Sequence, residues 1–211
     1  MRSESKFYRT VFAGFLLLCF AHAQSAPTKQ SEARLFGFEA GMSREQIVLL
    51  VGSGSVDTKN SKGDTLWLNA APRPSTAVAK YVLVISPSRG LVKLITTSDA
   101  LQADSEGSKL RVAFDTAASA LSKEYGTPTQ QIDSCTEWPG ICERLLASLL
   151  LAGERRLANH WNLEEPIDSV YTVHVEAIGK DIASGWVVTL YELNGFHQYE
   201  NEKASKRATE N

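Results

Sequence analysis

Two pairs of segments rich in β-branched residues constrain the fold of this 211-residue chain more than any other feature. Residues 80–85 (KYVLVI) and 91–97 (LVKLITT) are separated by residues 86–90, and residues 169–178 and 185–193 by residues 179–184. Parallel strands need a crossover of about a dozen residues or more, so each pair predicts an antiparallel hairpin. Pro87 and Gly90 suit the first turn, because proline presets φ and glycine accepts a positive φ.

Helical periodicity appears in three other segments. Residues 43–51 predict a short helix, and residues 108–125 a longer one with apolar positions three and four apart, ended by Gly126 and Pro128. Residues 143–158 predict a further amphipathic helix, with Leu145, Leu149 and Leu157 on its apolar face. Between the loops 52–64 and 70–76, residues 65–69 predict a short strand.

This order of elements predicts an α+β fold. We expect an antiparallel sheet of hairpins with two or three helices packed on one face, within a domain at residues 35–197. The same order leaves open two tandem helix-plus-sheet units, residues 35–104 and 105–197.

The two ends of the chain differ from this domain. Residues 1–23 combine basic residues, an apolar run and an Ala21-His22-Ala23 cleavage site, and so predict a signal peptide. The apolar run is about half the ~20 residues that span a bilayer, and Leu18 before Cys19 argues against lipidation, so no stable membrane anchor is expected. Residues 24–34 predict an extended lead-in, and residues 198–211 a polar tail that is disordered or a frayed helix.

The predicted export and the charge of the chain limit the kinds of partner that it can bind. The sequence after residue 23 has 19 basic and 23 acidic residues, and its basic residues are scattered among acids. Nucleic-acid binding requires a basic patch, so no nucleic-acid partner is expected. The protein is predicted to be periplasmic or secreted.

Two cysteines follow the signal segment, Cys135 and Cys142. In an oxidising compartment an even pair favours a disulfide, and two buried thiols are the alternative. If it were free, Cys142 near a helix start would have a lowered pKa and could act as a nucleophile. Trp138 lies in the turn between the cysteines, where it either forms an exposed anchor for a protein interface or folds over the disulfide.

The stretch GMSREQIVLLVGSGS, residues 41–55, ends in glycines and serines that suggest a phosphate-binding loop. Ser43 and Gln46 instead form the S-x-x-Q capping box of a helix N-terminus, flanked by Met42 and Ile47 as a hydrophobic staple. The glycines follow this helix, whereas a phosphate cradle precedes one, so Gly52 is predicted to be a C-terminal cap.

The same stretch resembles a known family. Gly41 to Ile47, with Leu50 and Gly52, is similar to the "G-M-[ST]-x-x-[EQ]-[VI]…L-G" stretch of BamE-like (SmpA/OmlA) envelope proteins, whose fold is related to that of β-lactamase-inhibitor proteins. The segment 125–128 (YGTP) echoes the same helix end. The chain departs from the family in its length, in Ser53 where proline often stands, and in lacking the lipobox cysteine. The resemblance implies a helix pair on an antiparallel sheet and a protein-binding role without catalytic residues.

Enzymatic alternatives depend on few residues. His174 and Glu176 share one face of a predicted strand and could supply two metal ligands, but no third ligand is visible nearby, and a satisfied histidine is the simpler interpretation. The sequence contains no G-x-S-x-G, H-E-x-x-H or S-x-x-K site with its companions, and no cofactor is predicted.

The sequence therefore predicts an exported, non-enzymatic protein that binds another envelope or periplasmic protein, in an assembly or scaffold role. An inhibitor or immunity protein against an exported hydrolase is the alternative within binding. A hydrolase with an unrecognised site is the alternative from another class. The partner's identity and the oligomeric state are left open.

Overall fold

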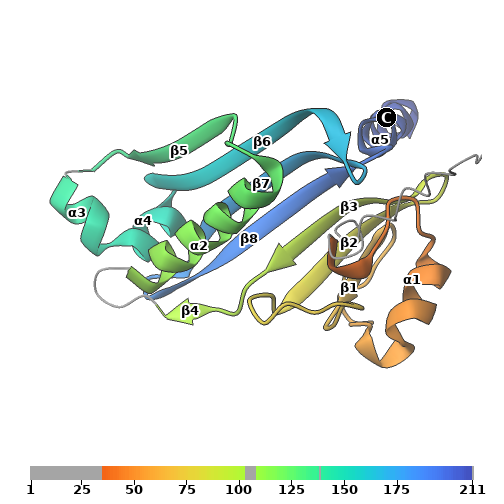
Figure 1. The fold of residues 1–211 in the computed structure, drawn as a ribbon, viewed down its shortest axis with the longest axis horizontal. Helices are drawn as coiled ribbons and strands as arrows, with labels where there is room; N and C mark the ends of the chain where they lie inside the picture. Colours follow the sequence, from red (N-terminus) through yellow and green to blue (C-terminus); the bar gives the residue numbers. More distant parts are fainter. Residues whose placement is uncertain (1–34, 103–107, 138, 211) are drawn as a thin grey trace, which may run out of the picture.

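The computed structural model describes residues 35–102, 108–137 and 139–210 (Figure 1). The predicted signal peptide, the lead-in at residues 24–34 and Trp138 lie outside the described residues. The helices are α1 (Arg44–Val51), the short 3-10 turn η2 (Ser53–Ser55), α2 (Ser108–Tyr125), α3 (Pro139–Arg144), α4 (Leu146–Ala152) and α5 (Phe196–Glu210). The strands are β1 (Thr65–Leu68), β2 (Lys80–Ser86), β3 (Gly90–Thr97), β4 (Leu101–Gln102), β5 (Gln130–Cys135), β6 (Arg155–Ile167), β7 (Val170–Asp181) and β8 (Ser184–Leu193).

The strands form one antiparallel sheet in the order β1-β2-β3-β8-β7-β6-β5, with β4 paired to β8. Both predicted hairpins are present, as β2–β3 and β7–β8. Strand β3 pairs with β8, so the two helix-plus-sheet segments of the chain share a single sheet. The α+β class with an antiparallel sheet, predicted from hairpin spacing, is confirmed.

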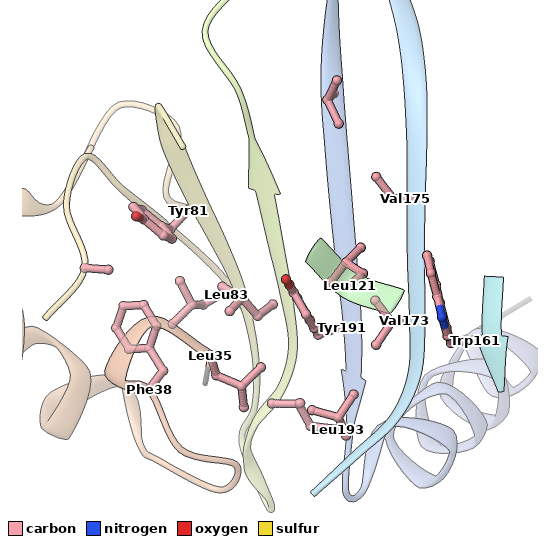
Figure 2. Close-up of a cluster of buried hydrophobic side chains, with 14 of the residues drawn as sticks. Leu35, Phe38, Tyr81, Leu83, Leu121, Trp161, Val173, Val175, Tyr191 and Leu193 are labelled. Carbon is pink, nitrogen blue, oxygen red and sulfur yellow. The ribbon is translucent and has the colours of Figure 1, made fainter. Parts of the chain in front are cut away.

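One face of this sheet, which we call the covered face, holds the hydrophobic core. Helices α2 and α4 lie over strands β6 to β8 (Figure 1). On the β1–β3 side, the segment before α1 covers the same face, where the ring of Phe36 contacts that of Tyr81. Figure 2 shows part of this layer, with Leu121 of α2 between Tyr191 and Trp161 of the strands. The largest side chains of the core are all but inaccessible to solvent, with Trp161 and Tyr81 each 1% exposed.

Two glycines permit the close approaches that this layer needs. A Cβ on Gly179 of β7 would lie 2.4 Å from the Ala147 carbonyl oxygen, so glycine lets α4 pack directly on the strand. Gly90 in the β2–β3 turn has φ +71°, and a Cβ there would collide with the backbone of Gly41. That segment is bonded to the hairpin, because the Gly41 amide donates to the Leu91 carbonyl over 2.9 Å.

The helix predicted at residues 143–158 is wrong in its second half. The helical residues belong to α3 and α4, and α4 ends at Gly153, which adopts the left-handed conformation with φ +75°. From Arg155 the chain is strand β6, in which Leu157 is buried on the covered face. The left-handed Gly153 ends the helix, and the chain continues as a strand. The leucine spacing nevertheless extends past this glycine.

Other elements also go beyond the predictions. Strand β5, at the edge of the sheet, was not predicted from the sequence. The tail, predicted to be disordered or a frayed helix, forms α5, and Tyr199 fastens it by donating a hydrogen bond from its hydroxyl to Asp64 over 2.9 Å. Of the helices within the described ranges, none is long and apolar enough to cross a membrane.

Candidate functional site on the open face of the sheet

The second face of the sheet, which we call the open face, is defined by a row of side chains that are in register across seven strands. The row runs from Trp67 to Val82, Ile95, Leu190, His174, His160 and Gln130. Directly opposed residues of an antiparallel pair point to the same side, so all seven side chains share this face. Among the helices that the structure describes, α5 reaches it at one end, where Lys93 Nζ lies 4.2 Å from the Phe196 ring centroid.

The half of the open face on β1, β2, β3 and β8 has an apolar centre. Trp67, Ile95 and Leu190 are each partly exposed, while Val82 is 6% exposed. The adjacent rows add Val84 and Val188, and towards the β7–β8 turn Ile178 and Trp186. Apolar side chains that are partly exposed on β1, β3 and β8 therefore run side by side with Val82 across this half of the open face.

The half on β6 and β7 carries a cluster of charged and polar side chains, which we call the histidine cluster. His160 and His174 are paired across the strands, with their Nδ1 atoms 3.1 Å apart. His174 Nε2 lies 3.0 Å from Glu176 Oε2, and Arg156 Nε donates to Glu176 Oε1 over 3.3 Å. The side chains of His174 and Glu176 are only 16% and 28% exposed.

These contacts set the charge states of the cluster. The hydrogen bond from His174, together with the positive charge of Arg156, lowers the pKa of Glu176, so its carboxylate is ionised at neutral pH. Burial lowers the pKa of His160, and the neighbouring His174 and Arg156 lower it further. A neutral His160 is therefore the dominant form at neutral pH.

The ionised carboxylate also selects a tautomer for its neighbour. Because Glu176 can only accept a hydrogen bond, His174 must carry a proton on Nε2, and in the neutral ring its Nδ1 then bears a lone pair. That lone pair faces His160. The cluster can accordingly share a proton between two rings or offer nitrogen lone pairs to a cation.

The predicted disulfide site lies away from this cluster, at the β5 edge. The sulfur atoms of Cys135 and Cys142 lie 1.99 Å apart, the distance of a disulfide, which links β5 to α3. Beside it, Asp133 forms ion pairs of 2.7 Å with both Arg111 and Arg155, so the edge strand is fastened to α2 and β6. Trp138, the predicted interface anchor within this loop, lies outside the described residues.

A hollow with a volume of about 490 Å³ lies elsewhere, between the segment 35–40 and the β6–β7 turn. Asp168 and Ser169 in that turn both have positive φ, as a two-residue hairpin of the primed type requires. Neither His174 nor Glu176 lines this hollow, so it does not support the metal-dependent enzyme that was considered from the sequence.

Of the cluster, the sequence suggested only His174 and Glu176, and the structure adds His160 and Arg156. His160 lay just past the wrongly predicted helix, so its strand partner could not be assigned from the sequence. The structure brings no group of three or more His, Cys, Asp or Glu side chains into an arrangement suited to a metal ion, within the residues it describes.

No family model matches the sequence, and comparisons with curated proteins and with solved structures give no match.

Proposed function

We propose that this chain is an exported, non-enzymatic protein that binds another protein of the cell envelope or periplasm through the open face of its sheet. The observation that carries the proposal is the apolar row from Trp67 to Leu190, which none of the described helices covers as α2 and α4 cover the other face. Antiparallel sheets normally place polar residues on a face that meets only water.

The composition of the open face supports a protein partner. Protein interfaces combine an apolar centre, often with tryptophan, and a polar rim. Here Trp67 and Trp186 lie among aliphatic side chains, and charged groups border them, with Lys180 Nζ 5.8 Å from the Trp186 ring centroid and Lys93 paired to Glu192 over 3.3 Å. The Lys93–Glu192 pair neutralises charge at the border, and the centre is apolar.

Three features of the chain support export and an envelope partner. The first 23 residues have the pattern of a signal peptide, and a disulfide suits an oxidising compartment. Helix α1, which carries the resemblance to BamE-like proteins, has its capping box formed, with Ser43 and Gln46 bonded reciprocally. Those proteins act by binding, and we propose the same mode of action here.

Photo-crosslinking in the exporting cell tests the proposal. A benzoylphenylalanine residue at Leu190 on the open face should give a discrete product, whereas the same residue at Val112, which is 62% exposed on α2, should not. Absence of a product at Leu190, or the same products from both positions, would contradict the proposal.

The mass and identity of the product refine it. A product of about twice the mass of the exported chain would indicate self-association in place of a different partner. A hydrolase that loses activity on binding would indicate an inhibitor or immunity protein, and an assembly component would indicate a scaffold role.

A further inference from the structure

We propose that His160 and His174 form a binding site for one divalent transition-metal ion of the zinc, copper and nickel class, held between their two Nδ1 atoms. The site lies on the polar half of the open face and goes beyond the proposed protein-binding function, on which it does not depend. Two cross-strand imidazoles supply the protein ligands, and the solvent-facing positions of the ion are left to water.

The separation of the nitrogen atoms fits this role. Two ligands at 2.0–2.1 Å from a tetrahedral ion are about 3.3 Å apart. The Nδ1 atoms of His160 and His174 are 3.1 Å apart, close to that separation.

The two Nδ1 atoms lie within hydrogen-bonding distance of each other, so a bound ion would take the place of that hydrogen bond. A straight N–H···N bond of this length, in the plane of both rings, would place the ring centroids about 5.4 Å apart. The centroids are 4.1 Å apart with an interplanar angle of 40°. A tetrahedral ion bound in the plane of both rings would place the centroids about 5.2 Å apart, so binding turns the two imidazoles outward by about 1 Å at their centroids.

Glu176 supplies the support that such a ligand needs. Metal-binding imidazoles usually donate their other N–H to a carboxylate, which fixes the tautomer and raises ligand basicity. Glu176 accepts from His174 Nε2 over 3.0 Å and is held in place by Arg156. His160 needs only to carry its proton on Nε2 to present a second lone pair, and this change of tautomer releases no net proton.

The chemistry of the donors sets the class of ion. Neutral imidazole nitrogen suits zinc, copper and nickel, whereas magnesium and calcium prefer oxygen ligands. With two protein ligands the ion keeps open positions, which suits exchangeable binding better than a closed structural site.

Calorimetric titration of the mature, untagged protein with Zn²⁺ at pH 7.5 tests the proposal. We expect one ion per chain, with affinity reduced at least tenfold in His160→Gln and in His174→Gln. Glu176→Gln should weaken binding by about tenfold, since loss of a supporting carboxylate typically costs 10–100-fold. His197→Gln, on the exposed surface of α5, is the matched control and should bind as the wild type does.

Two further measurements separate the site from general effects. Urea midpoints of the variants should match the wild type, which excludes unfolding as the cause of lost binding. Long-range ¹H–¹⁵N spectra should show the Nδ1 atoms of both rings shifting on addition of Zn²⁺ and not of Mg²⁺. Equal Zn²⁺ affinity for the wild type and the His160→Gln/His174→Gln double variant, or spectra that report coordination through Nε2, would overturn the proposal.

Discussion

The two faces of the sheet are built from alternate residues of the same strands, and they differ in how their apolar side chains are used. On the covered face, Tyr191 and Leu193 of β8 are 7% and 2% exposed beneath the helices and the segment before α1. On the open face, Leu190 of the same strand is only partly covered, although it lies between Ile95 and His174 in register. The apolar side chains of the covered face stabilise the fold. Those of the open face need a different explanation, which the proposed binding of a partner provides.

Two leucines of β8 provide the test of this difference with the largest expected effect on stability. Leu193→Ala should lower the free energy of unfolding by about 2–5 kcal/mol, because it removes a buried side chain from a packed core. Leu190→Ala should cost about 1 kcal/mol, since much less of its area is removed from water on folding. Urea unfolding of both variants measures the two values, and equal losses would show that the two faces are packed alike.

The disulfide gives the next effect in size. It belongs to the covered face, where it fastens α3 to the edge strand β5 across a sequence separation of seven residues. Replacing both cysteines by serine should cost about 2–3 kcal/mol, the chain-entropy value for a loop this short. Thermal or urea unfolding with and without reductant measures it. If reductant leaves the wild-type midpoint unchanged, the bridge adds nothing to the stability of this edge.

How far the sequence predicts this architecture depends on the position of each element in the sheet. Helix α2 and both hairpins could be placed because their apolar positions face a single core and therefore recur with a clear period. Edge strand β5 has only Ile132 as an aliphatic residue, because most of its side chains face solvent, and so it lacks that period. Leu157 continued the leucine spacing of α4 by chance, and Gly153 decided where the helix ends.

The candidate site was less predictable than the fold, for a related reason. His174 and Glu176 are two residues apart on one strand, so their common face follows from strand geometry alone. His160 joins them only through the register of β6 on β7, and no local pattern encodes that pairing. The open face as a whole depends on the same long-range registers.

Helix α5 gives a smaller effect, at the one place where a described helix meets the open face. Tyr199→Phe should cost about 1–2 kcal/mol, because the buried hydroxyl donates to the Asp64 carboxylate. Burial also raises the pKa of Tyr199 in the folded state. A raised pKa gives stability that is present below the ordinary value of about 10 and is lost as pH rises through the folded value.

The wild type should therefore lose more stability than Tyr199→Phe between pH 9 and pH 12. Urea midpoints of the two proteins across this range give the comparison. Parallel curves would indicate that the hydroxyl does not differ in ionisation between the folded and unfolded states.

The smallest effect on stability belongs to the centre of the open face, where the effect on binding should be the largest. Ile95→Gln replaces a partly exposed side chain between Val82 and Leu190, and should change the free energy of unfolding by no more than about 1 kcal/mol. Its affinity for the partner captured at Leu190 should fall at least tenfold, about 1.4 kcal/mol or more, because a polar amide would be desolvated in an apolar interface. Val112→Gln on the outer surface of α2 should change neither quantity.

These two readouts together separate the possible origins of the apolar row. Lost stability with unchanged binding would mean that the row belongs to the core, and the contrast between the faces would fail. Unchanged stability with lost binding would mean that the sheet retains these side chains for a partner, at the cost of exposing them to water while the protein is alone. Because Ile95 and Leu190 are adjacent in register, an Ile95→Gln/Leu190→Gln double variant should show coupled losses of affinity if one partner surface covers both. Additive losses would instead assign the two residues to separate contacts.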